Sequence, residues 1–217
     1  MLQLLHFVLG IVVGYFLKKC IIQLTNKQHI SKTTQYYYQH KPFVEILTGL
    51  TFVLCFNTLG FSLELFRILV LSCFLIVIAY IDYEHRIILD VVLFLMIGAG
   101  FIINIYIGQI SPLMMLLSGL LGGSIFLLLA LTSKGGFGGG DVKFMAVIGV
   151  WLGLKYTLLT MLVSIFLGGI GAAFLLFMRI KGRKDYIPFG PYMALATFLT
   201  LLYGNGMLEW YWSCIYH

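Results

Sequence analysis

The sequence predicts an all-α, polytopic membrane protein, and three observations support this fold class. Of its 217 residues, 61% are hydrophobic and only 10% are charged, and the mean hydropathy is +1.01. A chain of this composition has too few polar residues to cover a water-facing surface. Several apolar runs are long enough to cross a bilayer, which takes roughly 20 residues per helix. We therefore expect about eight transmembrane helices joined by short cytoplasmic loops.

The apolar runs follow one another from the start of the chain, and each ends where glycine, proline or charged residues interrupt it. The first, LQLLHFVLGIVVGYFL, has no basic residue before it and no small-residue cleavage pattern after it. We expect a retained span there rather than a cleaved signal peptide. Further spans are expected near Phe43–Leu59, Ser62–Ile81, Ile87–Ile107, Pro112–Leu131, Val142–Leu152, Tyr156–Met178 and Ile187–Tyr203, the run at Val142–Leu152 being short.

Basic residues indicate the orientation. They accumulate after the first run, and no acidic residue follows until Glu45. If this segment is cytoplasmic, alternation of the spans leaves only Arg67 and Lys155 of the fourteen Lys and Arg residues on the outer side, as the positive-inside rule expects. Both termini are then outside. A net charge of +6 divided among loops beside lipid favours contact with anionic membrane lipids and argues against nucleic acid.

Two functional segments are expected. Residues 1–42 comprise the first helix and one short basic cytoplasmic loop, which is too small for a domain with its own core. Residues 43–217 form the main transmembrane domain. The four cysteines lie far apart without a CxxC pair, so they indicate neither a zinc cluster nor a disulfide framework, and we expect them to be small packing residues; they are Cys20, Cys55, Cys73 and Cys214.

The stretch SKGGFGGGDVKFMA breaks the apolar pattern. Five of the six residues from Gly135 to Gly140 are glycine, and Asp141 follows. Glycine costs about 1 kcal/mol relative to alanine in a helix interior, but it lets the backbone approach another group closely. The phosphate-binding pattern GxxxxGK[ST] and the dinucleotide pattern GxGxxG are absent. The stretch is therefore either a slack hinge or the scaffold of a site.

Acidic residues gather near the ends of spans, where they mark a functional site by default. Asp82, Glu84 and Asp90 lie in AYIDYEHRIILD, and Asp141 lies in GFGGGDVK. If Asp82 and Asp141 meet, their carboxyls share a proton, so that one deprotonates water while the other polarises a peptide carbonyl. A divalent cation for transport could instead be bound by Asp82, Glu84, His85 and Asp141. The residues by themselves leave both alternatives open. Helical geometry does not place Glu84 or His85 on the face of Asp82, and we expect both to be solvated.

Three segments carry a resemblance to a known family. IDYEHRIILD, GFGGGDVKFMAVIGVWLG and YIPFGPYMALA, preceded by KPFVEILTGLTF, resemble the type IV prepilin peptidases, which are GxGD aspartic membrane proteases. The similarity runs from about Lys41 to Gly204. It implies that Asp82 and Asp141 are the catalytic pair. Leu89 stands where the family usually has proline, which is expected to change only local backbone stiffness.

The resemblance implies an endopeptidase of the bacterial inner membrane that removes the short basic leader of prepilins or pseudopilins at the cytoplasmic membrane edge. It implies no cofactor for proteolysis and no metal. A polytopic ion or solute transporter that uses the aspartates as a cation site is the alternative. The prolines of IPFGPY are expected to bend the last span, and we hypothesise that a basic residue such as Lys143 pairs with an early glutamate of the mature pilin. The residues expected to bind substrate or support the site are Gly138, Gly140, Lys143, Asp90, Pro188, Gly190 and Pro191.

Many members of the family also methylate the new amino terminus with S-adenosylmethionine and carry paired CxxC motifs in a cytoplasmic loop. Here the loop from Lys18 to Pro42 is short and holds only Cys20. By this resemblance, residues 1–42 are a reduced methyltransferase-type segment and residues 43–217 are the aspartic peptidase domain. The resemblance therefore leaves methylation, with S-adenosylmethionine as its cofactor, either lost or performed without these cysteines.

Overall fold

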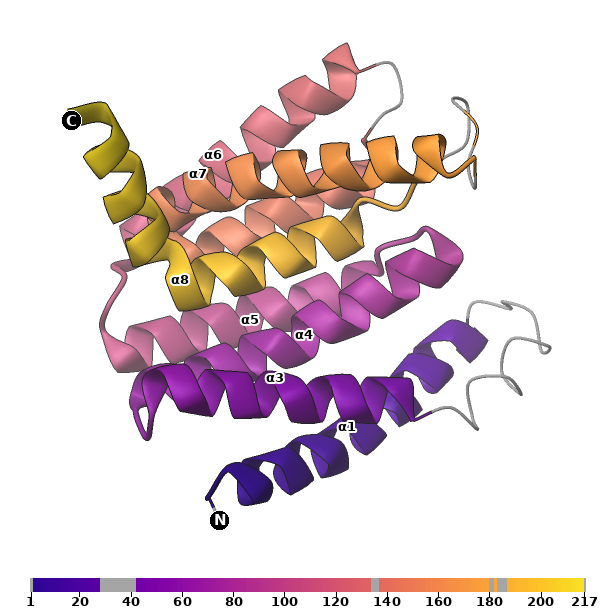
Figure 1. Cartoon of the computed structure of the whole chain (residues 1–217), viewed down its shortest axis with the longest axis vertical. Helices are drawn as coiled ribbons and strands as arrows, with labels where there is room; N and C mark the ends of the chain where they lie inside the picture. Colours follow the sequence, from indigo (N-terminus) through magenta and orange to yellow (C-terminus); the bar gives the residue numbers. More distant parts are fainter. Residues whose placement is uncertain (1, 28–41, 134–136, 180–181, 183–186, 217) are drawn as a thin grey trace. The chain divides into compact units, whose positions relative to one another are not determined.

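The computed structural model describes residues 2–27, 42–133, 137–179, 182 and 187–216. Within these ranges the chain is almost entirely helical and contains no strand. This confirms the predicted all-α fold. The helices are α1 (Leu2–Lys27), α3 (Phe43–Leu59), α4 (Leu63–His85), α5 (Asp90–Ile107), α6 (Pro112–Thr132), α7 (Gly139–Phe177) and α8 (Gly190–Tyr216) (Figure 1).

Length and composition make this a polytopic membrane protein, as predicted. Among the described residues, five helices are long and apolar enough to cross a membrane, namely α1, α4, α5, α6 and α7. Helix α3 is also apolar but shorter. The expected number of about eight spans is not confirmed by this count and stays a prediction.

The chain divides into two compact units, residues 1–81 and residues 82–217. Helix α4 belongs to the first unit up to Ile81, and its last turn, from Asp82, belongs to the second. The functional division expected after residue 42 remains a prediction, because most of the basic loop lies outside the described residues.

In the first unit, glycines bring α1 and α3 into backbone contact. A Cβ at Gly10 would lie 2.6 Å from the Cα of Gly49, and one at Gly14 would lie 2.7 Å from the Cα of Glu45. Only small residues allow two helices to approach so closely. The mostly buried ion pair between Lys18 Nζ and Glu45 Oε1, at 2.9 Å, ties the same two helices together.

In the second unit, α7 is broken at Gly153, whose φ of 71° and ψ of 173° are not helical. Glycine adopts such angles without a Cβ clash. Just before the break, the side-chain amide of Asn104, in α5, donates to the carbonyl oxygens of Val150 and Trp151 at 3.2 and 3.3 Å. The break lies between the two runs that the sequence predicted as separate spans, Val142–Leu152 and Tyr156–Met178; that they are two spans stays a prediction.

The first half of α7 packs closely on α6. A Cβ at Gly122 would lie 3.0 Å from the carbonyl oxygen of Met145, and Ser118 Oγ donates to the carbonyl of Gly149 at 2.8 Å. Buried backbone-to-hydroxyl bonds of this kind hold helices together in a bilayer. The packing fixes the position of the start of α7, where the glycine run ends.

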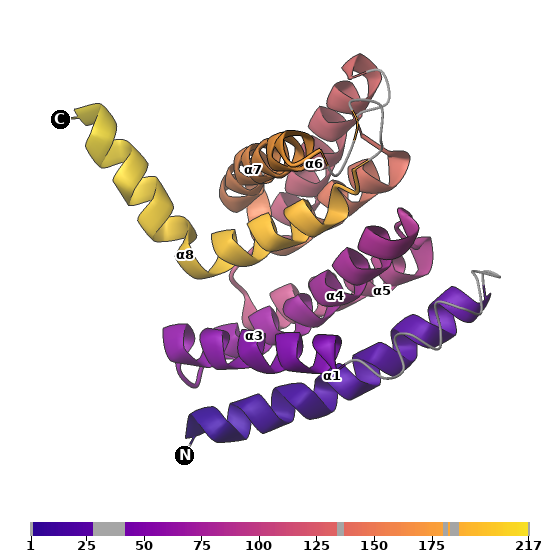
Figure 2. The same ribbon diagram turned by 45° about the vertical axis from the view of Figure 1, so that its right-hand side comes forward.

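Helix α8 begins at Gly190, with Pro188 before it and Pro191 in its first turn. Proline suits this turn because the first N–H groups of a helix have no helical acceptor. The prolines therefore define where the helix starts, and the expectation that they bend the last span is wrong. The bend of α8 seen in Figures 1 and 2 lies further along the helix.

Candidate active site

Asp141 lies in the first turn of α7 and is only 2% exposed. Its Oδ2 accepts a hydrogen bond from the N–H of Gly138 at 2.8 Å, while its own N–H donates to the Gly138 carbonyl at 3.1 Å. A carboxylate at this position satisfies an orphan N–H of the helix start. The positive end of the helix dipole offsets part of the cost of burying the carboxyl group. The end of the glycine run is thus a scaffold that delivers a backbone donor to Asp141.

Asp82 lies in the last turn of α4 and is also 2% exposed. Its Oδ2 accepts a hydrogen bond at 2.8 Å from the N–H of Gly190, the first residue of α8. The backbone approaches so closely that a Cβ at Gly190 would lie 2.7 Å from this oxygen. Each of the two aspartates is therefore held by a backbone N–H at the start of a helix.

Two aromatic residues connect these helix starts. Phe137 directly precedes Gly138, and Phe189 directly precedes Gly190. Their ring centroids are 4.8 Å apart, with an interplanar angle of 85°. The ring contact therefore brings together the two helix starts that hold Asp141 and Asp82, while the catalytic role of the aspartates stays a prediction.

Neither phenylalanine is among the site residues that the sequence predicted. The signal that could have found them is a repeated dipeptide, because Phe-Gly occurs in GGFGGGD and again in IPFGP. A dipeptide is too common to predict contact between distant segments, and only the folded chain shows that the two rings meet.

The remaining predicted site residues divide into two groups. Gly140 lies against the loop that follows α4, where its Cβ would lie 3.1 Å from the Cβ of Ile88. Asp90, at the start of α5, accepts hydrogen bonds from Lys143 Nζ at 2.8 and 2.9 Å. Both side chains of this ion pair are more than half exposed. Gly140 is thus part of the close packing at the start of α7, whereas the Lys143–Asp90 pair lies on the surface.

Glu84 and His85 were expected to be solvated, but the structure buries most of both side chains. Their side chains are 7% and 12% exposed, and His85 Nε2 lies 3.8 Å from Glu84 Oε2. The expectation was wrong because the periodicity of one helix shows which residues share a face, but not what covers that face.

No cluster for a metal ion is present among the residues that the structure describes, since no three His, Cys, Asp or Glu side chains lie close enough together to hold one. The alternative of a transporter with a cation site at the aspartates therefore has no support from the described geometry.

Fold and site define a polytopic helical membrane protein with a pair of buried aspartates held at two helix starts. The sequence model of the type IV leader peptidase family matches residues 69–173, a range that includes Asp82 and Asp141. The chain is also 35% identical, over 175 residues, to the prepilin leader peptidase/N-methyltransferase of Bacillus subtilis, with 78% of this chain and 68% of that relative covered. The chain belongs to the type IV leader peptidase family.

Other relatives carry the same name. The prepilin leader peptidase/N-methyltransferase of Xanthomonas campestris is 33% identical over 180 residues, which cover 78% of this chain and 61% of the relative. That of Aeromonas salmonicida is 32% identical, with 80% of this chain and 62% of the relative covered. The matched part of the chain thus spans about three fifths of the length of these two relatives. No solved structure matches the chain.

Proposed function

We propose that this chain is a membrane aspartic endopeptidase that removes the short basic leader from type IV prepilins or pseudopilins. The observation that carries the proposal is the pair of buried aspartates, Asp82 and Asp141, each held through Oδ2 by a backbone N–H at a helix start. The names of the relatives, which are prepilin leader peptidase/N-methyltransferases, support the same reaction.

The two carboxyl groups act as one unit with a shared proton. Both backbone bonds use Oδ2, and in the proposed reaction Oδ1 of Asp82 and of Asp141 is the oxygen that acts on water and on the peptide bond. The ionised carboxylate takes a proton from water, whose oxygen attacks the carbonyl carbon, while the protonated carboxyl donates to the carbonyl oxygen. The tetrahedral intermediate then collapses: the C–N bond breaks, the leaving nitrogen takes up a proton from the pair, and one hydroxyl of the intermediate returns its proton to the pair as the carbonyl re-forms.

The substrate is expected to lie with its apolar helix in the bilayer and its leader on the cytoplasmic side of the bacterial inner membrane. The distribution of Lys and Arg supports this side for the active site, with both termini outside. A basic protein face does not attract a basic leader, so hydrophobic docking of the pilin helix supplies most of the affinity. Membrane lipids are the other partners.

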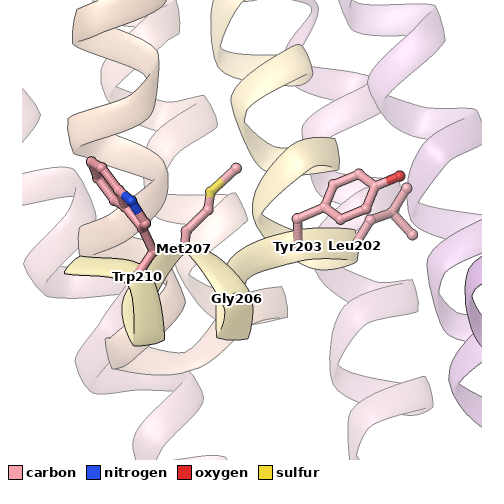
Figure 3. Close-up of a pocket in the computed structure, with 5 residues that line it drawn as sticks. All are labelled: Leu202, Tyr203, Gly206, Met207 and Trp210. Carbon is pink, nitrogen blue, oxygen red and sulfur yellow. The ribbon is translucent and has the colours of Figure 1, made fainter. Parts of the chain in front are cut away.

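Methylation of the new amino terminus rests only on the names of the relatives. The segment expected to contribute to it lies largely outside the described residues. One hollow among the described residues, of about 470 Å³, lies along α8 (Figure 3). It has no charged side chain to pair with the amino and carboxylate groups of S-adenosylmethionine and does not fit that cofactor; its lining residues are Leu202, Tyr203, Gly206, Met207 and Trp210.

The test is mass spectrometry of a prepilin co-expressed with the chain and with its variants Asp82→Asn and Asp141→Asn. Asparagine keeps the size of aspartate but cannot exchange the proton, so each variant should lose cleavage completely. The matched control is Glu209→Gln, which neutralises an exposed acid of α8 away from the aspartates. It should process prepilin as the unchanged chain does.

The mass of the product separates the two activities. A shortened prepilin shows peptidase activity, and an added methyl group on the new amino terminus shows that methylation also occurs. An uncleaved prepilin, tried with several leaders and a folded enzyme, or cleavage that survives both asparagine variants, would reject the proposal.

A further inference from the structure

The two aspartates are held by the same local arrangement. In each case the donor is the N–H of a glycine at a helix start, and the residue directly before this glycine is a phenylalanine. Phe137 precedes the donor to Asp141, and Phe189 precedes the donor to Asp82. The two donor segments are more than 40 residues apart in the chain, and the edge-to-face contact of these two rings, at 4.8 Å, joins them directly.

The rings are themselves fixed by buried neighbours. Phe126 of α6 is fully buried, and its ring centroid lies 5.5 Å from that of Phe137 and 6.1 Å from that of Phe189. The ring of Phe189 also lies directly against Gly168 in the second half of α7, which leaves no room for a Cβ there. An edge-to-face pair supported in this way has one preferred geometry rather than a range of them.

We propose that Phe137 and Phe189 form a clasp that sets the distance between the two aspartates. This inference rests on the proposed peptidase function. The phenylalanine clasp touches neither water nor the peptide bond, so its members are positioning residues and not catalytic ones. Because each ring is one residue from the glycine N–H that holds an aspartate, a movement of one ring away from the other moves a donor, and the carboxyl group bound to that donor follows.

The chemistry explains why such a device is needed. Two carboxyls share a proton and act on one peptide bond only when both stand at the right distance from it, and an error of about 1 Å is enough to cost roughly 100-fold in rate. The aspartates lie at the ends of different helices. A glycine directly follows each phenylalanine, and glycine does little to stiffen the backbone that carries the donor N–H. The ring contact supplies the stiffness that the glycines lack.

The kinetic test uses Phe137→Leu and Phe189→Leu, singly and together, with purified enzyme and prepilin. Leucine keeps an apolar side chain but removes the edge-to-face contact. Each single variant should lower kcat about tenfold or more with little change in KM, because docking of the pilin helix is untouched. The double variant should be little worse than either single one, since both remove the same contact. Phe137→Tyr keeps the ring and should retain most of the activity.

The control is Phe166→Leu. Phe166 lies in α7 and is 68% exposed, so the same chemical change is made away from the clasp. It should leave kcat and KM unchanged. A thermal melt of every variant shows whether a lower kcat reflects loss of folded enzyme.

A second measurement does not depend on cleavage. Hydrogen exchange, followed by mass spectrometry on the enzyme in lipid nanodiscs, reports how firmly the N–H groups of Gly138 and Gly190 are bonded. Phe137→Leu should speed exchange by about tenfold or more in both segments, including the distant one around Gly190. Phe189→Leu should do the same for the segment around Gly138.

The outcomes separate the two proposals. A wild-type enzyme that cleaves, with leucine variants that keep its kcat, overturns the clasp alone. A loss in the double variant equal to the product of the two single losses also overturns it, because the rings would then act independently. If the wild-type enzyme cleaves no prepilin, the proposed function fails, and the exchange experiment still decides the clasp: faster exchange in the distant segment supports it, and unchanged exchange overturns it.

Discussion

Replacing Gly190 by alanine should disable the site without unfolding the protein. A Cβ at Gly190 would lie 2.7 Å from Oδ2 of Asp82 and 3.0 Å from its Cβ, whereas ordinary contact begins at 3.4 Å. Asp82 must therefore retreat by about 0.7 Å, the difference between 3.4 and 2.7 Å. Since a misplacement of about 1 Å is enough to cost roughly 100-fold in rate, we expect kcat for prepilin cleavage to fall by about 10- to 100-fold.

The backbone itself accepts this substitution, because φ of Gly190 does not lie in the left-handed region. The cost to stability is then only that of crowding, about 1–3 kcal/mol. Initial rates of cleavage over a range of prepilin concentrations, together with a thermal melt, measure the two effects separately.

Gly139→Ala is the matched control for this experiment. Gly139 lies in the first turn of α7, directly after the glycine that holds Asp141, but a Cβ there would meet nothing within 4 Å. It should keep the rate of the unchanged enzyme. The reasoning is refuted if Gly190→Ala cleaves within about twofold of the wild type, or if the control loses as much activity as the test variant.

Three further variants test the structure around the site. Asn104→Leu leaves two buried carbonyls before the break in α7 without their donor, and should lower stability by about 1–3 kcal/mol in a thermal melt; an unshifted melt would contradict that role. Gly153→Ala places a Cβ on a backbone with φ of 71° and should also cost about 1–3 kcal/mol, whereas Gly169→Ala, with open space around it, should not destabilise; equal melts would argue against strain at the break. Lys143→Ala removes a surface ion pair with Asp90 and should change stability by less than about 1 kcal/mol. A larger loss would mean that the pair is structural, and a loss of prepilin processing without a loss of stability would favour a substrate contact at this lysine.

Local signals in the sequence predicted most of the helices and singled out both aspartates as candidate site residues. The helices follow from apolar runs, because a bilayer demands long stretches that satisfy their own backbone hydrogen bonds. The aspartates stood out because acidic residues are scarce in this chain, and the glycine run marked Asp141 in particular. Such features need no knowledge of which segments meet.

Contacts between distant segments were decided by the tertiary structure alone. The sequence did not reveal that Gly190 holds Asp82, although the two are 108 residues apart, or that Asn104 serves the carbonyls at the break in α7. It also misjudged Glu84, whose side chain is buried. The physical reason is that hydropathy and helical periodicity describe one segment at a time. Hydrogen-bond partners and burial depend on how helices pack, and packing is a property of the whole unit.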